Sequence, residues 1–194
     1  MSDVISMSKG ETVELSKKVP GLHKVFAGAG WDVKQSGAAM DLDLAAFMLD
    51  ATGKVSGKGS FIYFNNKSSI CGSLQHGGDN LTGAGEGDDE TISVNLSTIP
   101  ESIKEILFVA SIYQATQRNQ SLKDLDNAFI RIVNQEGNAE IANYKINDPN
   151  ATGTTFVLGK LVRTGTEWNF TAIGEAETRD LTGLATNYGF QVAA

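Results

Sequence analysis

The sequence predicts an all-β fold, an antiparallel β-sandwich of about ten strands with one or two short helices. Two observations support this prediction. Short apolar or alternating segments recur along the whole chain, separated by clusters of turn-forming residues. Long helical patterns do not alternate with these segments, as they would in a parallel α/β fold. Neither a repeat nor a linker interrupts the 194 residues, so a single domain over residues 1–194 is expected.

The expected strands follow from local patterns. Residues 91–96 (TISVNL) alternate strictly between polar and apolar side chains, as in a strand with one buried face. Residues 105–113 (EILFVASIY) are apolar almost throughout, which is typical of a strand buried on both faces. The full set of expected strands is 12–15, 23–30, 42–49, 60–66, 91–96, 105–113, 128–135, 140–146, 154–163 and 168–174.

Helical signals are few. Residues 177–189 predict a short terminal helix, because Leu181, Leu184 and Tyr188 fall on one face and Gly189 can end it. Residues 121–127 predict about one turn. Residues 99–106 (IPESIKEI) carry a helical signal, since Pro100 stands where the first turn of a helix tolerates it.

The charge of the chain is concentrated in residues 78–90 (GDNLTGAGEGDDE). This segment has five carboxylates, four glycines and no lysine or arginine, and it supplies five of the seven excess negative charges. The absence of a basic stripe argues against nucleic-acid binding. The single cysteine, Cys71, excludes an intrachain disulfide, and we find neither a signal-peptide core nor an apolar run of membrane-spanning length. A soluble cytoplasmic protein is therefore expected.

Four interpretations of residues 78–90 compete. A solvated acidic loop is the simplest, since blocks of like charge repel and stay hydrated. A phosphate cradle is disfavoured, because the carboxylates would repel the anion and no helix follows. Carboxylate catalysis of the glycosidase type needs a cleft geometry that neighbours on one loop do not guarantee. Calcium takes about six to eight oxygens from carboxylates, amides and backbone carbonyls, all of which this segment offers.

A calcium site here would not be an EF-hand. Asp79 and Glu90 have the spacing of that motif's first and last ligands, but Leu81 and Gly83 stand where it needs oxygen side chains and Ala84 replaces its glycine. Zinc is disfavoured, because His76, Cys71 and Asp79 fall short of the four Cys or His ligands of a structural site. Further oxygen side chains near strand ends, each alone typical of a turn or cap, are Asp32, Asp41, Asp43, Asn65 and Asn66.

Six segments in order resemble the TerD family of tellurium-resistance and stress proteins: AGAGWDV, MDLDLAAFML, FIYFNN, HGGDNLTGAGEGDDETISVNL, NAFIRIVN and GTEWNFTAIG. The resemblance covers nearly the whole chain, from residue 9 to residue 192. It implies a cytoplasmic β-sandwich that binds two calcium ions at one end, with ligands from the acidic loop and the DLD segment. By position, the implied ligands are Asp79, Asn80, Gly83 through its backbone, Glu86, Asp88, Asp89, Glu90, Asp41 and Asp43, with Asp32 and Asn66 as further candidates. The chain departs from the family pattern at Ala84, where an acidic residue is common.

The predicted function is a non-enzymatic calcium-binding protein of a tellurite-resistance or stress-response system. Calcium would order the acidic loops as a surface for other resistance proteins, some of them membrane-associated, without insertion of this chain into a membrane. One alternative is a metal-dependent hydrolase, which needs an open coordination position and a pocket. The other is a calcium-dependent membrane-surface binder, although residues 53–60 (GKVSGKGS) have two lysines and no apolar tip.

Overall fold

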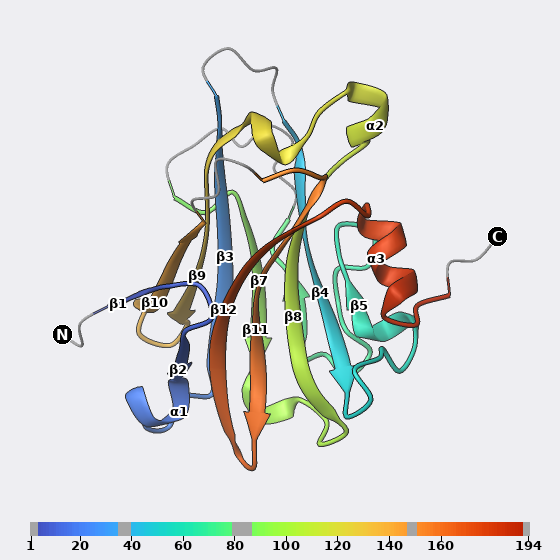
Figure 1. The fold of residues 1–194 in the computed structure, drawn as a ribbon. Helices are drawn as coiled ribbons and strands as arrows, with labels where there is room; N and C mark the ends of the chain where they lie inside the picture. The colour runs from blue at the N-terminus through green and yellow to red at the C-terminus, as the bar shows by residue number, and fades with distance from the viewer. Residues whose placement is uncertain (1–3, 35–39, 79–86, 147–150, 192–194) are drawn as a thin grey trace.

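Two six-stranded sheets pack face to face in the computed structural model, which describes residues 4–34, 40–78, 87–146 and 151–191 (Figure 1). Sheet A has the order β1-β10-β9-β3-β7-β6 and sheet B the order β2-β12-β11-β8-β4-β5. The strands are β1 (Ile5–Met7), β2 (Thr12–Glu14), β3 (Lys24–Val33), β4 (Leu42–Asp50), β5 (Phe61–Ile62), β6 (Leu74–His76), β7 (Glu90–Asn95), β8 (Ile103–Ile112), β9 (Leu125–Asn134), β10 (Ala139–Ile146), β11 (Thr155–Thr164) and β12 (Glu167–Glu177). The helices are α1 (Leu15–Lys18), α2 (Ala115–Arg118) and α3 (Leu181–Asn187), with 3-10 turns at Lys58–Ser60, Leu96–Thr98 and Leu122–Asp124.

The apolar pattern of each strand decides its place. β7 alternates as predicted, with Ile92 and Val94 buried between the sheets. β8 is the centre of sheet B, between β11 and β4, and both of its faces are covered. Phe108 faces the main core, whereas Leu107 and Val109 join a second apolar cluster on the outer face of sheet B, under α3 (Figure 1). Because both faces of β8 are covered, consecutive residues of this strand are apolar and do not alternate with polar ones.

The N-terminal segment connects both sheets. β1 is parallel to β10 at the edge of sheet A, and every other strand pair in the described sheets is antiparallel. β2 then pairs with β12 at the edge of sheet B, with Thr12 opposite Thr171. Four residues between β1 and β2 are enough for the chain to cross from one sheet to the other.

The sandwich prediction is confirmed, with twelve strands in the described part of the chain. The terminal helix is confirmed as α3, whose N-cap Asp180 accepts a hydrogen bond from Gly183 N. The helical signal in residues 99–106 does not give a helix. Only one turn forms, closed by a hydrogen bond from Ile103 N to the Pro100 carbonyl, because Ile103 and the residues after it are needed as a core strand.

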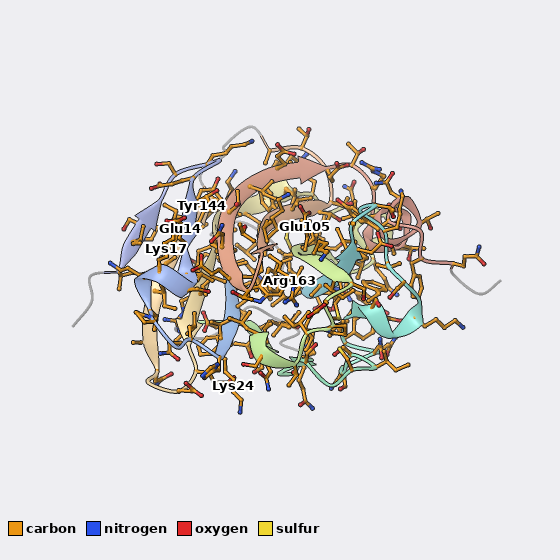
Figure 2. All side chains as sticks on the ribbon, turned by 90° about the horizontal axis from the view of Figure 1, so that it is seen from below. Glu14, Lys17, Lys24, Glu105, Tyr144 and Arg163 are labelled. Carbon is orange, nitrogen blue, oxygen red and sulfur yellow. The ribbon has the colours of Figure 1, made fainter. Side chains whose placement is uncertain are left out.

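Arg163 satisfies the carbonyls that a longer helix would have used. Its guanidinium donates to the Ile99 and Ile103 carbonyls over 2.9 and 3.1 Å, and it lies 4.5 Å from the centre of the buried Trp168 ring. Figure 2 looks onto this end of the sandwich, with Arg163 near the middle of the view. The strand expected over residues 60–66 is also shorter, because a tight turn between Tyr63 and Asn66 ends it after β5. β6 was not predicted.

Candidate metal centre at the loop end of the sandwich

The end of β3, the start of β4, the start of β9 and α2 lie at one end of the sandwich, which we call the loop end (Figure 1). Residues 87–89 reach the same end, because β7 runs antiparallel to β3 and its first residue, Glu90, lies opposite Ala29. The predicted ligands Asp79, Asn80, Gly83 and Glu86 lie outside the described residues. The predicted ligands that the structure does place are Asp32, Asp41, Asp43, Asn66, Asp88, Asp89 and Glu90.

Asp88 is held against the outer face of sheet A by Arg131 of β9. The Arg131 guanidinium donates to both oxygens of the Asp88 carboxylate, over 2.7 and 2.8 Å, and its third contact is Glu140 at 2.8 Å. The Asp88 side chain is 8% exposed, and this pairing raises the pKa of Arg131, which therefore stays charged. A bidentate pair of this kind fixes orientation as well as charge. Asp88 is thus an anchor of the acidic segment in this arrangement.

Two glycines of β3 make room for the acidic segment. A Cβ on Gly28 would overlap the Asp88 carboxylate, and one on Gly30 would overlap the Phe129 ring and approach the Gly87 carbonyl to 2.8 Å. Glycines two residues apart on one face of a strand mark a close approach of another segment. The AGAG sequence of β3 is therefore explained by residues 87 and 88 lying across it.

Asp89 is fixed beside the end of β3. Its backbone N–H donates to the Ala29 carbonyl over 2.9 Å, and its Oδ2 accepts from Trp31 N over 2.8 Å. Burial raises the pKa of the Asp89 carboxyl, and the charges of Asp32, Glu90 and Asp88 raise it further, against the opposing effect of the Trp31 hydrogen bond. Asp32 is close enough to contribute to this repulsion, and its own Oδ2 accepts from Asn127 Nδ2 over 3.1 Å. Negative charge is therefore crowded around Asp89.

Glu90 points in the other direction, into the space between the sheets. Its carboxylate accepts the backbone N–H of Leu44 in β4 over 2.6 Å. The imidazole of His76 lies 3.0 Å from the Leu44 carbonyl through Nε2 and 3.5 Å from the Glu90 carboxylate, and both side chains are fully buried. A carbonyl only accepts, so Nε2 donates. Gly78 N donates to Nδ1 over 3.2 Å, so the hydrogen bonds describe the neutral imidazole.

Together, His76 and Glu90 pair both backbone groups of Leu44, at a point on β4 that its neighbour β5 does not reach. These bonds join the two sheets across the core. They also bring β4, which follows Asp41, next to Glu90 at the end of the acidic segment.

Asp41 and Asp43 belong to the β4 side of the sandwich: Asp41 immediately precedes β4 and Asp43 is part of it. Leu42 and Leu44 face the core, so Asp43 alternates to the outer face of the sheet, where it lies opposite Ser111. The Asp41 carboxylate lies 3.8 Å from the Arg118 guanidinium of α2. Both aspartates are 5% exposed. The predicted ligand set is therefore divided between the two sheets.

Asn66 lies in the turn after β5. Its side-chain amide donates to the Lys58 and Phe61 carbonyls over 3.1 and 2.5 Å, which closes the turn.

The chain matches the TerD domain family over residues 3–188. The protein belongs to the TerD family. It is 45% identical to general stress protein 16U of Bacillus subtilis (strain 168) over 190 residues, which cover 97% of this chain and 98% of that protein. It is 40% identical to tellurium resistance protein TerD of Serratia marcescens, over 97% of this chain and 99% of that protein. A crystal structure of a protein of unknown function shares the fold, with a TM-score of 0.68 and 24% identity over 89% of this chain and 99% of that one.

The donor chemistry of this TerD-family protein fits calcium at the loop end. Asp32 and Asp89 offer hard carboxylate oxygens, the ligand type that calcium prefers, at a place where negative charges repel one another. Within residues 4–34, 40–78, 87–146 and 151–191, no three His, Cys, Asp or Glu side chains come together as a metal site. A complete shell therefore needs further oxygens, and Asp79 and Glu86 in the undescribed part of the acidic segment carry carboxylates.

Sequence reasoning missed Arg131 and His76. Arg131 lies 43 residues from Asp88, so no local pattern connects them. A signal for the contact did exist in Gly28 and Gly30, whose spacing indicates a segment lying across one face of β3. His76 was considered only as a zinc ligand, and its role toward Leu44 has no sequence signature. Cys71 is partly buried, and Trp31 and Trp168 are buried.

None of the helices in the described part of the chain is long and apolar enough to cross a membrane.

Proposed function

We propose that this TerD-family protein binds calcium at the loop end of the sandwich and acts without catalysis in a tellurite-resistance or stress response. The observation that supports calcium is the position of Asp89. Its hydrogen bonds to Ala29 and Trp31 hold it beside Asp32 and next to the segment that carries Asp79 and Glu86. Calcium at this point would offset the repulsion among these carboxylates with its positive charge, which their apolar surroundings do not provide.

Neighbouring acidic residues have different roles in this calcium site. Asp32 and Asp89, with oxygens from residues 79–86, are the ligands of one ion. Asp88 and Glu90 act as anchors, because Arg131 holds the first and Leu44 N with His76 holds the second. The two-ion count and the ligand roles of Asp41, Asp43 and Asn66 remain predictions from the family resemblance.

Ordering of the acidic segment would give the protein its biological output. An ion bound between the anchored residue Asp89 and residues 79–86 would fix the loop relative to sheet A and create a defined surface. We propose that other proteins of the resistance or stress system, including membrane-associated ones, bind this surface. The names of the two relatives, a general stress protein and a tellurium resistance protein, support this physiological setting.

Calorimetric titration of EDTA-treated protein tests the calcium site. The parent should bind calcium and prefer it to magnesium, since magnesium demands a tight octahedron and releases its water reluctantly. Asp89→Asn, which keeps the Trp31 hydrogen bond, should lose most of the calcium heat. Asp126→Asn, which removes an exposed aspartate of β9 near the same end, is the matched control and should titrate like the parent.

Thermal unfolding gives a second readout. Calcium at a hundredfold excess over Kd should stabilise the parent by roughly 2.7 kcal/mol, which corresponds to a Tm increase of about 5–10 °C for a chain of this size. Equal Tm values in EDTA and millimolar calcium would remove the basis of the proposal. Tellurite survival of a sensitive bacterium that expresses the parent or Asp89→Asn tests the physiological part, and only the parent should protect.

A further inference from the structure

A separate cleft opens on the outer face of sheet B, on the opposite side of that sheet from the core and from Glu90. Its volume is about 710 Å³, within the range of small-molecule sites. The start of β4, the end of β8, residues in the range 61–65, and parts of α2 and α3 line it. These elements surround one part of sheet B (Figure 1).

One wall of the cleft is aromatic. Phe61 and Tyr63 stack with ring centroids 4.5 Å apart, Tyr63 meets Phe64 edge-on at 5.3 Å, and Phe64 meets Tyr113 edge-on at 6.0 Å. Tyr113 is 38% exposed, unusually open for so large a ring. Linked rings of this kind offer electron-rich faces and little conformational freedom.

The floor of the cleft is polar and acidic. Asp43 is 5% exposed, and beside it the hydroxyls of Ser111 and Thr155 share a buried hydrogen bond of 2.8 Å. Among the described residues that line the cleft, the charged ones are Asp43 and Asp180, and both are acidic. Asp43 is the buried charge of the two and Asp180 is exposed, so an anionic ligand would be repelled at Asp43 and a cation would be attracted there.

Two features of the rim support a ligand that combines charge with an apolar body. Gln114 has a left-handed backbone with φ of 52°, which is costly for a residue other than glycine and recurs at binding sites. Its side-chain amide donates to the Tyr113 hydroxyl over 3.3 Å. The Arg118 guanidinium lies 5.3 Å from the Tyr113 ring centre and 3.8 Å from the Asp41 carboxylate. A cation of the protein itself thus already uses a ring and a carboxylate together at this rim.

We propose that this cleft binds a small organic cation, an ammonium group carried on an apolar body. The ammonium group would lie near Asp43, and its methyl or methylene groups would contact the rings of Tyr63, Phe64 and Tyr113. Cations bind aromatic faces by electrostatic attraction, most strongly where water is displaced. A hydrated metal ion would gain nothing from this wall, because the rings of Phe61 and Phe64 supply no oxygen ligand. The binding is independent of the calcium site at Asp89.

Choline is a suitable probe, and its uncharged carbon isostere 3,3-dimethylbutan-1-ol is the matched control ligand. Both are titrated into the EDTA-treated protein and followed by backbone amide NMR shifts. Choline should shift the amides of Asp43 and Ser111, and the isostere should bind at least tenfold more weakly. Asp43→Asn should weaken choline by roughly ten- to a hundredfold, and Tyr113→Leu, at an exposed position, by about three- to thirtyfold. Asp126→Asn should leave choline binding unchanged.

The outcomes separate this inference from the calcium proposal. Asp89→Asn should weaken calcium and leave choline unchanged, whereas Asp43→Asn should weaken choline and leave the calcium heat of the Asp89 site unchanged. Equal affinity for choline and its isostere would show that the positive charge of choline does not contribute to binding, and would overturn the inference. So would shifts at Asp43 caused by calcium and not by choline, which would assign Asp43 to metal binding.

Discussion

The contact between Arg131 and Asp88 should be an unusually strong ion pair for its position, and a double-mutant cycle measures it. Arg131→Met keeps the apolar stem of the side chain, and Asp88→Asn keeps its shape. The control pair is Lys160 and Glu105 on sheet B, 2.9 Å apart. The two cations are almost equally exposed, at 29% for Arg131 and 30% for Lys160, but Asp88 is 8% exposed and Glu105 is 31%.

The difference in burial and geometry sets the expected magnitudes. Exposed pairs contribute about 0.2–1 kcal/mol, which is the expected coupling for the lysine pair. Arg131 makes two charge-assisted hydrogen bonds to a buried carboxylate, and about 1.5–3 kcal/mol is a usual net contribution where a hydrogen bond involves a charged group. A coupling of about 2 kcal/mol is therefore expected for Arg131 and Asp88.

Urea unfolding followed by circular dichroism, in EDTA, measures all four members of each cycle. EDTA removes any contribution of bound calcium, so the coupling reports the ion pair alone. A coupling for Arg131 and Asp88 no larger than that of Lys160 and Glu105 would refute the anchor role of Asp88. It would also restore the view taken from the sequence, in which Asp88 is one of five carboxylates that repel one another.

Three further predictions concern neighbouring residues. Gly28→Ala should lower the free energy of unfolding by displacing Asp88 from Arg131, and the loss should largely disappear when Arg131→Met is already present, as urea unfolding of the double variant shows. Asp89→Asn should raise the metal-free stability at pH 7. The pKa of Asp89 is higher in the folded protein than its unfolded value of about 3.9, so the ionisation of Asp89 lowers the stability as pH rises through the interval between these two pKa values. The gain from Asp89→Asn should therefore vanish in thermal melts at a pH below this interval. Glu90→Leu should lower Tm more than Glu140→Leu does, because it removes the acceptor of the buried Leu44 N–H, whereas Glu140→Leu removes a partner of Arg131.

Local patterns were sufficient for most of the fold. The alternation in residues 91–96 and the apolar run in 105–113 both report how many faces of a strand are covered, and the structure covers one face of β7 and two of β8. The failure at 99–106 has the same origin, since a proline compatible with a helix gives no information about the competing need for a core strand. β6 is three residues long and two of them are polar, so its pattern is too short to be informative.

The candidate site was less predictable because its order depends on distant partners. Composition alone located the acidic segment, and the family resemblance supplied a ligand set. Neither indicates that Asp88, Asp89 and Glu90, three consecutive residues, have three different environments: an arginine, the end of β3, and the space between the sheets. Strict alternation would put Asp88 and Glu90 on one face, but Asp88 lies on the outer face of sheet A and Glu90 between the sheets, so only the partners decide which carboxylates a cation can use.

The N-terminal crossing from sheet A to sheet B has a consequence for synthesis of the protein. The partners of Thr12–Glu14 are residues 169–171, and those of Ile5–Met7 are residues 142–144. While the ribosome is still translating the middle of the chain, the first two strands have no edge to join, and loops this long are slow to close. The first two strands of the nascent chain therefore have no partner strand until β10 and β12 have been synthesised, so both sheets gain these edges only late in synthesis.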